Sequence, residues 1–109
     1  MKLYLDDLRS APPGWHRTHT AEETIDLLRT GEVEELSLDY NLGPDSSQTG
    51  AAVPRWIDQK IASDPDWTPP KRIRVHSTHR VGRAQLVELL KGIRRRLLEQ
   101  GRTAPELDW

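Results

Sequence analysis

The sequence predicts a single α/β domain built on a mostly parallel sheet. Its 109 residues are enough for one hydrophobic core but too few for two independent ones. Short apolar segments with strand patterning alternate with longer segments of helical periodicity, in the order strand, strand, helix, strand, helix, strand, helix. This order is typical of parallel strands joined by right-handed crossovers.

The first expected strand is the apolar run at residues 3–5, which stops at the carboxylate pair Asp6 and Asp7. Two prolines within residues 11–14 exclude a helix in the turn that follows. Residues 15–19 then have the pattern of a second short strand, which we expect at an edge of the sheet.

A helix is expected over residues 21–30. Thr20 and Glu23 have the spacing of a capping box, and Gly31 supplies a residue that commonly ends a helix. Both boundaries of this helix are therefore marked in the sequence.

The next expected strand, residues 36–38, again ends at a carboxylate, Asp39. Residues 43–50 have the composition of a loop, and a second helix begins near Pro54, because proline is tolerated in a first turn. The expected buried side of this helix includes Trp56, Ile57 and Ile61.

The last expected strand, residues 73–75, ends at His76 and Ser77. A long amphipathic helix over residues 81–100 follows. Its apolar positions are Leu86, Leu90, Ile93 and Leu97.

Gly101 is expected to cap the last helix. We therefore divide the chain into a domain of residues 1–101 and a loose C-terminal tail of residues 102–109.

Composition excludes several classes of function. The chain has no cysteine, which rules out a disulfide partner, a thiolate metal site and thiol redox chemistry. No apolar run approaches the roughly 20 residues that cross a bilayer, and no basic leader precedes the first strand. We expect a cytoplasmic protein without a membrane partner.

Charge is divided unevenly along the chain. Residues 1–70 contain 6 basic and 13 acidic side chains, whereas residues 71–109 contain 10 basic and 4 acidic ones. This division suits an acidic metal site that faces a basic wall and an anionic substrate. A solvated basic face on the last helix explains it equally well.

Polar side chains end three of the expected strands: Asp6 and Asp7, then Asp39, then His76 and Ser77. Ligands of open parallel sheets collect beyond the carboxyl ends of the strands, so these groups are expected around one mouth. Carboxylates that converge there repel one another unless a cation compensates them. Oxygen ligands favour magnesium, manganese or calcium over zinc.

A phosphoryl group fits beside such a cation. Ser77 can donate a hydrogen bond to it, and an arginine can clamp it with two donors. The candidate arginines are Arg9, Arg74 and Arg80. The alternative for Asp6 and Asp7 is a solvated turn or the start of a helix.

The histidines form two pairs at i, i+3, His16 with His19 and His76 with His79. That spacing in a strand sends the side chains to opposite faces, which argues against a zinc site. His76 is a candidate general acid or base and equally a candidate structural residue, whereas for His79 we favour a structural or surface role.

The four tryptophans and the basic last helix raise a further possibility, an RNA-binding adaptor. The tryptophans are scattered, however, and Trp56 has a spacing that suits the core.

The chain resembles a known family in several motifs. Residues 1–9 read MKLYLDDLR, residues 37–43 read SLDYNLG, Thr49 and Gly50 precede a helix with WID, and residues 73–77 read IRVHS. In combination these motifs are similar to the cyclic-phosphate processing receiver domain, an offshoot of the receiver domains of bacterial response regulators. The resemblance extends to about residue 93.

This resemblance implies a truncated receiver-like, flavodoxin-like three-layer fold with a short sheet of about four strands, the last strand and helix of a receiver being lost. It also implies a metal, Mg²⁺ or Mn²⁺, held by Asp6, Asp7 and Asp39, with the backbone carbonyl of Asn41 as a further ligand. A second copy of the chain is one candidate to cover the edge left by the missing strand.

In receivers the residue that matches Asp39 accepts a phosphoryl group, and a lysine on the final strand clamps it. No lysine occupies that place here, so Arg9 and His76 are expected to serve as clamp and proton carrier. The family implies cyclic phosphates as substrates, of the kind met in RNA end repair. The chain departs from the family pattern at Tyr40, Asn41, Ala51, Ala52 and His79.

Two hypotheses of function follow from these motifs. The first is a metal-dependent phosphoesterase that opens a nucleoside or RNA-terminal 2′,3′-cyclic phosphate, with Asp39, His76 and Arg9 as catalytic residues. The second is a non-catalytic receiver-like module that senses phosphate, accepts a phosphoryl group or binds a protein.

Overall fold

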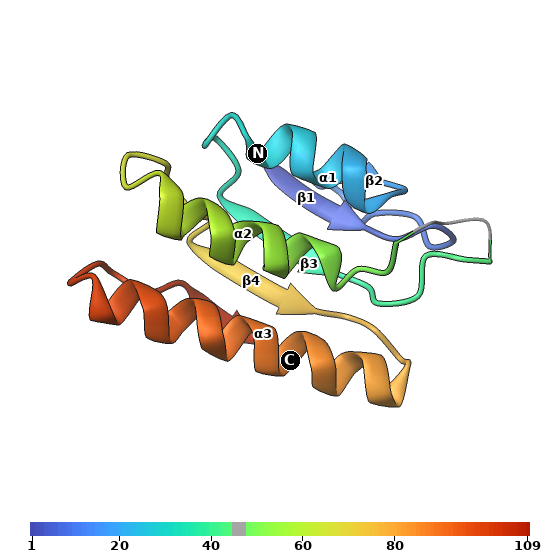
Figure 1. Ribbon diagram of the computed structural model, residues 1–109. Helices are drawn as coiled ribbons and strands as arrows, with labels where there is room; N and C mark the ends of the chain where they lie inside the picture. Colours follow the sequence, from blue (N-terminus) through green and yellow to red (C-terminus); the bar gives the residue numbers. More distant parts are fainter. Residues whose placement is uncertain (45–47) are drawn as a thin grey trace.

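The computed structural model describes residues 1–44 and 48–109. The strands are β1 (Lys2–Leu5), β2 (His16–Thr18), β3 (Glu35–Leu38), β4 (Arg72–Val75) and β5 (Glu106–Asp108). The helices are α1 (Ala21–Leu28), α2 (Ala52–Ser63) and α3 (Arg80–Glu99). Figure 1 shows their arrangement.

One sheet in the order β2-β1-β3-β4-β5 joins all five strands, and every pair is parallel. This order, with the central strand β3 between β1 and β4, is that of a receiver-like α/β fold, so the expected fold class is confirmed. The short strand β2 lies at an edge, as expected.

The sheet has five strands instead of about four, because the segment expected to be a loose tail contains β5. Leu107 pairs with Ile73, and Glu106 pairs with Arg72. The guanidinium of Arg72 also donates to the carboxylate of Glu106 at 2.7 Å. β5 is only three residues long and contains one apolar residue, which is too little to mark a strand in the sequence.

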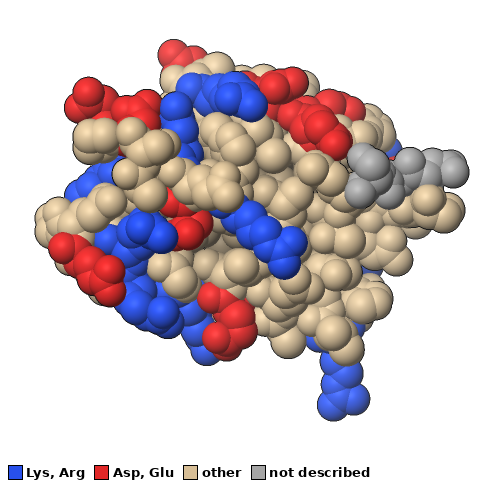
Figure 2. All heavy atoms as spheres, in the orientation of Figure 1, with Lys and Arg blue, Asp and Glu red and all other residues tan. Residues whose placement is uncertain are grey.

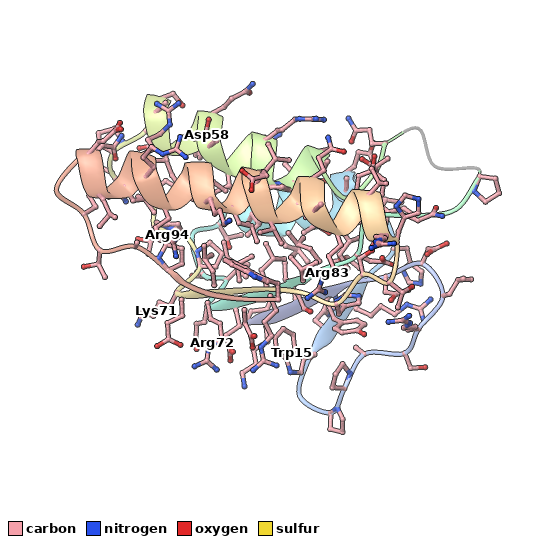
Figure 3. The ribbon with its side chains drawn as sticks, turned by 90° about the horizontal axis from the view of Figure 1, so that it is seen from below. Trp15, Asp58, Lys71, Arg72, Arg83 and Arg94 are labelled. Atoms are coloured by element: carbon pink, nitrogen blue, oxygen red, sulfur yellow. The ribbon has the colours of Figure 1, made fainter. Side chains whose placement is uncertain are left out.

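The helices in the described residues form one layer, not the two expected on either side of a three-layer fold. Figures 1 and 3 show α1, α2 and α3 on the same face of the sheet. The connection between β1 and β2 contains no helix, in keeping with Pro12 and Pro13. The opposite face of the sheet, which we call the open face, therefore has no helix over it among the described residues.

The core lies between the sheet and the helices. It includes the four predicted positions of α3, Leu86, Leu90, Ile93 and Leu97, all fully buried. Leu3, Leu5, Leu36, Leu38 and Ile73 face them from the strands.

The N-cap role of Thr20 at the start of α1 is confirmed, because the backbone N–H of Glu23 donates to Oγ1 of Thr20 at 3.1 Å. On α2, Ile57 and Ile61 are fully buried, whereas Trp56 is only partly buried and packs edge to face on Trp67.

Basic and acidic side chains are interspersed over the helix-covered face (Figure 2). In the described residues, no helix has the length and apolarity required to cross a bilayer.

Candidate metal and phosphate site

Three side chains from three neighbouring strands meet at the carboxyl edge of the sheet. Leu5, Leu38 and Val75 are paired across β1, β3 and β4, so the next residue of each strand lies beside the others. Those next residues are Asp6, Asp39 and His76. One ligand atom from each lies within 4.8 Å of the others.

Asp6 is almost fully buried, with 1 % of its surface exposed. Its Oδ1 accepts hydrogen bonds from the backbone N–H groups of Leu8 and Arg9, both at 2.9 Å, and its Oδ2 accepts one from Nε2 of His76 at 3.1 Å. Burial acts to raise the pKa of Asp6, but these donors together outweigh it and hold the pKa below its ordinary value. Asp6 is therefore an ionised carboxylate.

His76 is held from three directions. Burial lowers its pKa, against the opposing influence of Asp6, so the ring is neutral at pH 7. An ionised carboxylate can only accept a hydrogen bond, so Nε2 of His76 carries the ring proton and donates to Asp6. Nδ1 is then the acceptor nitrogen, and it accepts a hydrogen bond from Oγ of Ser37 at 2.7 Å. The ring of Tyr4 stacks on the imidazole at 4.1 Å between centroids.

Asp39 follows β3, and its Oδ1 accepts a hydrogen bond from the N–H of Tyr40 at 2.8 Å. Its backbone carbonyl lies against Gly50, where a Cβ would clash with that oxygen. Gly50 therefore allows the chain before α2 to pack closely against the end of β3.

A cleft of about 610 Å³ opens at this edge of the sheet. It is lined by Asp6, Asp7, Leu8, Arg9, Asp39, Asn41, Gly43, Pro44, Thr78 and His79. A larger cleft, of about 820 Å³, lies at the other end of the strands between residues 68–72 and 102–106. The smaller cleft is the candidate site, because it contains the converging carboxylates.

Asp7 lines the cleft but is not one of the three groups within 4.8 Å of one another. Its carboxylate packs on Gly43, which has a φ of 92° and would place a Cβ 2.8 Å from Oδ2 of Asp7. The side chain of Asn41 accepts from the N–H of Gly43 at 3.0 Å. Asn41 thus uses its side-chain oxygen to shape the loop.

The expected phosphate-binding residues lie in different places. Arg9 lines the cleft, half of its side chain is exposed, and it donates to the carbonyl oxygen of His76 at 3.3 Å. Ser77 is buried and accepts from the N–H of His79 at 3.3 Å. Arg74 lies on the open face, and Arg80 is exposed in the first turn of α3, so neither lines the cleft.

His79 has a structural contact, in line with the role favoured for it. Its Nδ1 accepts from the N–H of Gly82 at 2.9 Å and so caps α3. Its ring stacks on Tyr40 at 5.3 Å, and Tyr40 in turn packs directly on Gly82.

The donors present fit a hard divalent cation. Ligand atoms on opposite sides of Mg²⁺ are about 4 Å apart, and the carboxylate oxygens of Asp6 and Asp39 lie within 4.8 Å of each other, close to the spacing that one ion requires. The buried and ionised Asp6 supplies the charge that favours such an ion.

Sequence reasoning missed Ser37 and Tyr4. Both alternate with buried leucines along their strands, which places their side chains on the open face. Ser37 lies two residues before Asp39, and Tyr4 lies two residues before Asp6. This alternation in the sequence could have identified them.

Comparison with known proteins agrees with the motifs. A family model described as the cyclic-phosphate processing receiver domain matches residues 1–92. No curated protein and no solved structure matches the chain significantly. The family match covers most of the chain and includes both carboxylate-ending strands. The chain therefore belongs to the family of cyclic-phosphate processing receiver domains.

Proposed function

We propose that this protein is a metal-dependent phosphoesterase that opens a cyclic phosphate on a nucleotide or an RNA terminus. The observation that carries the proposal is the convergence of Asp6, Asp39 and His76 to within 4.8 Å at the carboxyl edge of the sheet. The family description ties this kind of receiver domain to cyclic phosphates. A compartment that is reducing, such as the cytoplasm, suits a chain without cysteine.

Asp6 and Asp39 would hold Mg²⁺ or Mn²⁺, with Asp7 and the carbonyl of Asn41 as further ligands from the cleft. The bound ion supplies a Lewis acid for the phosphoryl oxygens and lowers the pKa of a bound water. Arg9 lies at the same mouth and stabilises the negative charge that develops on the phosphate.

His76 serves as the proton carrier in this proposal. Its neutral ring can take up a proton at Nδ1, the nitrogen that faces the hydroxyl of Ser37. The carboxylate of Asp6 beside Nε2 would stabilise the imidazolium that results.

The test is hydrolysis of 2′,3′-cyclic AMP by the purified protein with added Mg²⁺ or Mn²⁺. Asp39→Asn should reduce turnover by at least about 100-fold, as loss of one reacting group typically does. The matched control is Asp26→Asn, because Asp26 is an exposed aspartate on α1 that pairs with Arg29. Full turnover in excess chelator, or in Asp39→Asn, would refute the proposal.

A second candidate function is a phosphoacceptor or phosphate-sensing module without turnover. Two departures from the family pattern favour it: Tyr40 packs against α3, and Ala51 is fully buried, so neither supplies a polar group to the cleft. Incubation with acetyl phosphate and Mg²⁺, followed by intact mass, separates the two. A phosphoryl adduct that is absent in Asp39→Asn supports the module, and repeated turnover without an adduct supports the esterase.

A further inference from the structure

The open face of the sheet carries aromatic rings next to the candidate site. Trp15 and Arg72 project on the side opposite the helices (Figure 3). Tyr4, Ser37 and Arg74 are paired across β1, β3 and β4 and alternate with buried core residues, so they share that face. No helix covers these side chains within residues 1–44 and 48–109.

Three rings form a continuous row that starts at the site. His76 stacks on Tyr4 with 4.1 Å between centroids and 6° between ring planes. Tyr4 meets Trp15 edge to face at 6.4 Å. The row therefore runs from His76, whose Nε2 contacts the buried Asp6, to a partly exposed indole on the open face.

Cations surround the indole at the end of this row. The ammonium of Lys2 and the guanidinium of Arg74 each lie 5.8 Å from the Trp15 ring centroid. Nε of Arg17 and Nε of Arg74 are buried and have no hydrogen-bond partner among the described residues. Asp108 lies 3.8 Å from Nε of Arg74, which is too far for a hydrogen bond. The positive charge of both guanidinium groups favours an anionic or polar ligand on this face.

Three acidic residues of the open face, Glu35, Glu106 and Asp108, are each paired with a cation of that face. Glu35 forms an ion pair with Lys2 at 3.1 Å, and Glu106 forms one with Arg72 at 2.7 Å. Both belong to the row of residues farther from the cleft, and Trp15, which precedes the Leu3 partner His16, is level with that row. The row nearer the cleft contains Tyr4, Arg17 and Arg74, with Asp108 at its end beside Arg74.

We infer that Tyr4, Trp15 and Arg74 form a platform that binds the base of a nucleotide whose phosphate lies at the Asp6 and Asp39 cleft. Nucleobases stack on aromatic side chains and on arginine planes, and sheet faces present such groups to single-stranded nucleic acid. The continuity of the ring row with the phosphate site argues for one ligand that spans both. This inference rests on the proposed function and assigns the ligand a base.

The test compares ligands with and without a base. Binding of 3′-AMP, 2′,3′-cyclic AMP and the base-free glycerol 1,2-cyclic phosphate is measured by calorimetry with Mg²⁺ present. Trp15→Leu should weaken the two adenine ligands at least about 5-fold, the lower range for loss of one stacked base, and change binding of the base-free ligand less than 2-fold. Trp15→Phe should recover most of the affinity, because it keeps a ring.

Trp109→Leu is the matched control, since Trp109 is 44 % exposed and contacts Lys91 instead of the site. Its binding of all three ligands should be unchanged. Equal weakening of all ligands in Trp15→Leu, or no weakening, would overturn the platform. So would a wild-type dimer that Trp15→Leu converts to a monomer in sedimentation, because a second copy would then occupy the face.

The outcomes also separate this inference from the proposed function. Trp15-dependent binding of 3′-AMP without any turnover of the cyclic nucleotide supports the platform and refutes the esterase. Turnover that is indifferent to the base and to Trp15 supports the esterase and refutes the platform.

Discussion

Oγ of Ser37 lies 2.7 Å from Nδ1 of His76, and only 3 % of the Ser37 surface is exposed. The hydrogen bond joins β3 to the end of β4 and turns Nε2 of the imidazole toward Asp6. A buried serine on the open face thus helps to orient the histidine that contacts Asp6.

Removal of this hydroxyl should destabilise the protein. Ser37→Ala leaves Nδ1 of His76 without its partner, and a buried group left unsatisfied costs about 1–3 kcal/mol. Urea denaturation measures the free energy of unfolding. Ser63→Ala is the control, since Ser63 is exposed and its hydroxyl makes a long 3.4 Å bond to Lys60, so it should change stability by less than about 0.5 kcal/mol. Equal stability of the two variants would contradict the role of Ser37.

Without metal, the protein should also become less stable as the pH is lowered. Burial holds the pKa of His76 below its ordinary value of 6.5, so at mildly acidic pH the unfolded chain binds a proton there that the folded protein does not. The free energy of unfolding should therefore have its full value above pH 6.5. It should decrease as the pH falls below 6.5, until the pH is below the pKa of His76 in the folded protein.

The measurement is urea denaturation in chelator across this range. His76→Gln should flatten the pH dependence, whereas His16→Gln, which alters an exposed histidine on β2, should retain it. If His76→Gln shows the same change of unfolding free energy with pH as the wild type, another group is responsible for it.

Two glycines of α3 should respond oppositely to alanine. A Cβ at Gly82 would clash with the ring of Tyr40, whereas a Cβ at Gly92 would meet no atom within 4 Å. Gly92→Ala should stabilise the protein by about 0.5–1 kcal/mol, because alanine is the better helix former. Gly82→Ala should destabilise it by about 1–3 kcal/mol through overpacking. Thermal unfolding gives both values, and a stabilised Gly82→Ala would show that Tyr40 is not held against α3.

Removal of residues 102–109 should weaken the sheet. The truncation takes away β5, the packing of Leu107 on the core, and the bond from Arg102 to the carbonyl of Trp67 at 2.8 Å. Loss of the partly buried Leu107 and of the β4–β5 hydrogen bonds predicts a cost of about 1–3 kcal/mol. Removal of Trp109 alone, which leaves β5 intact, is the control. An unchanged urea midpoint in the longer truncation would mean that the segment is a loose tail after all.

Local pattern in the sequence was enough for the helices and for the position of the acidic groups. The capping pair Thr20 and Glu23 marked the start of α1, and apolar spacing marked the buried side of α3. Strands that end at Asp6 and Asp39 placed both carboxylates at one edge, since parallel strands share their carboxyl ends. These features depend on residues that are close together in the chain.

The rest depended on which segments pair in space. β5 became a strand because β4 offered an unpaired edge, and its three residues contain no signal of their own. His76 received its orientation from Ser37, which is 39 residues away, and from Asp6, which is 70 residues away. Sequence periodicity records which face of an element is apolar, whereas hydrogen bonds between distant strands form only after the sheet has set their register.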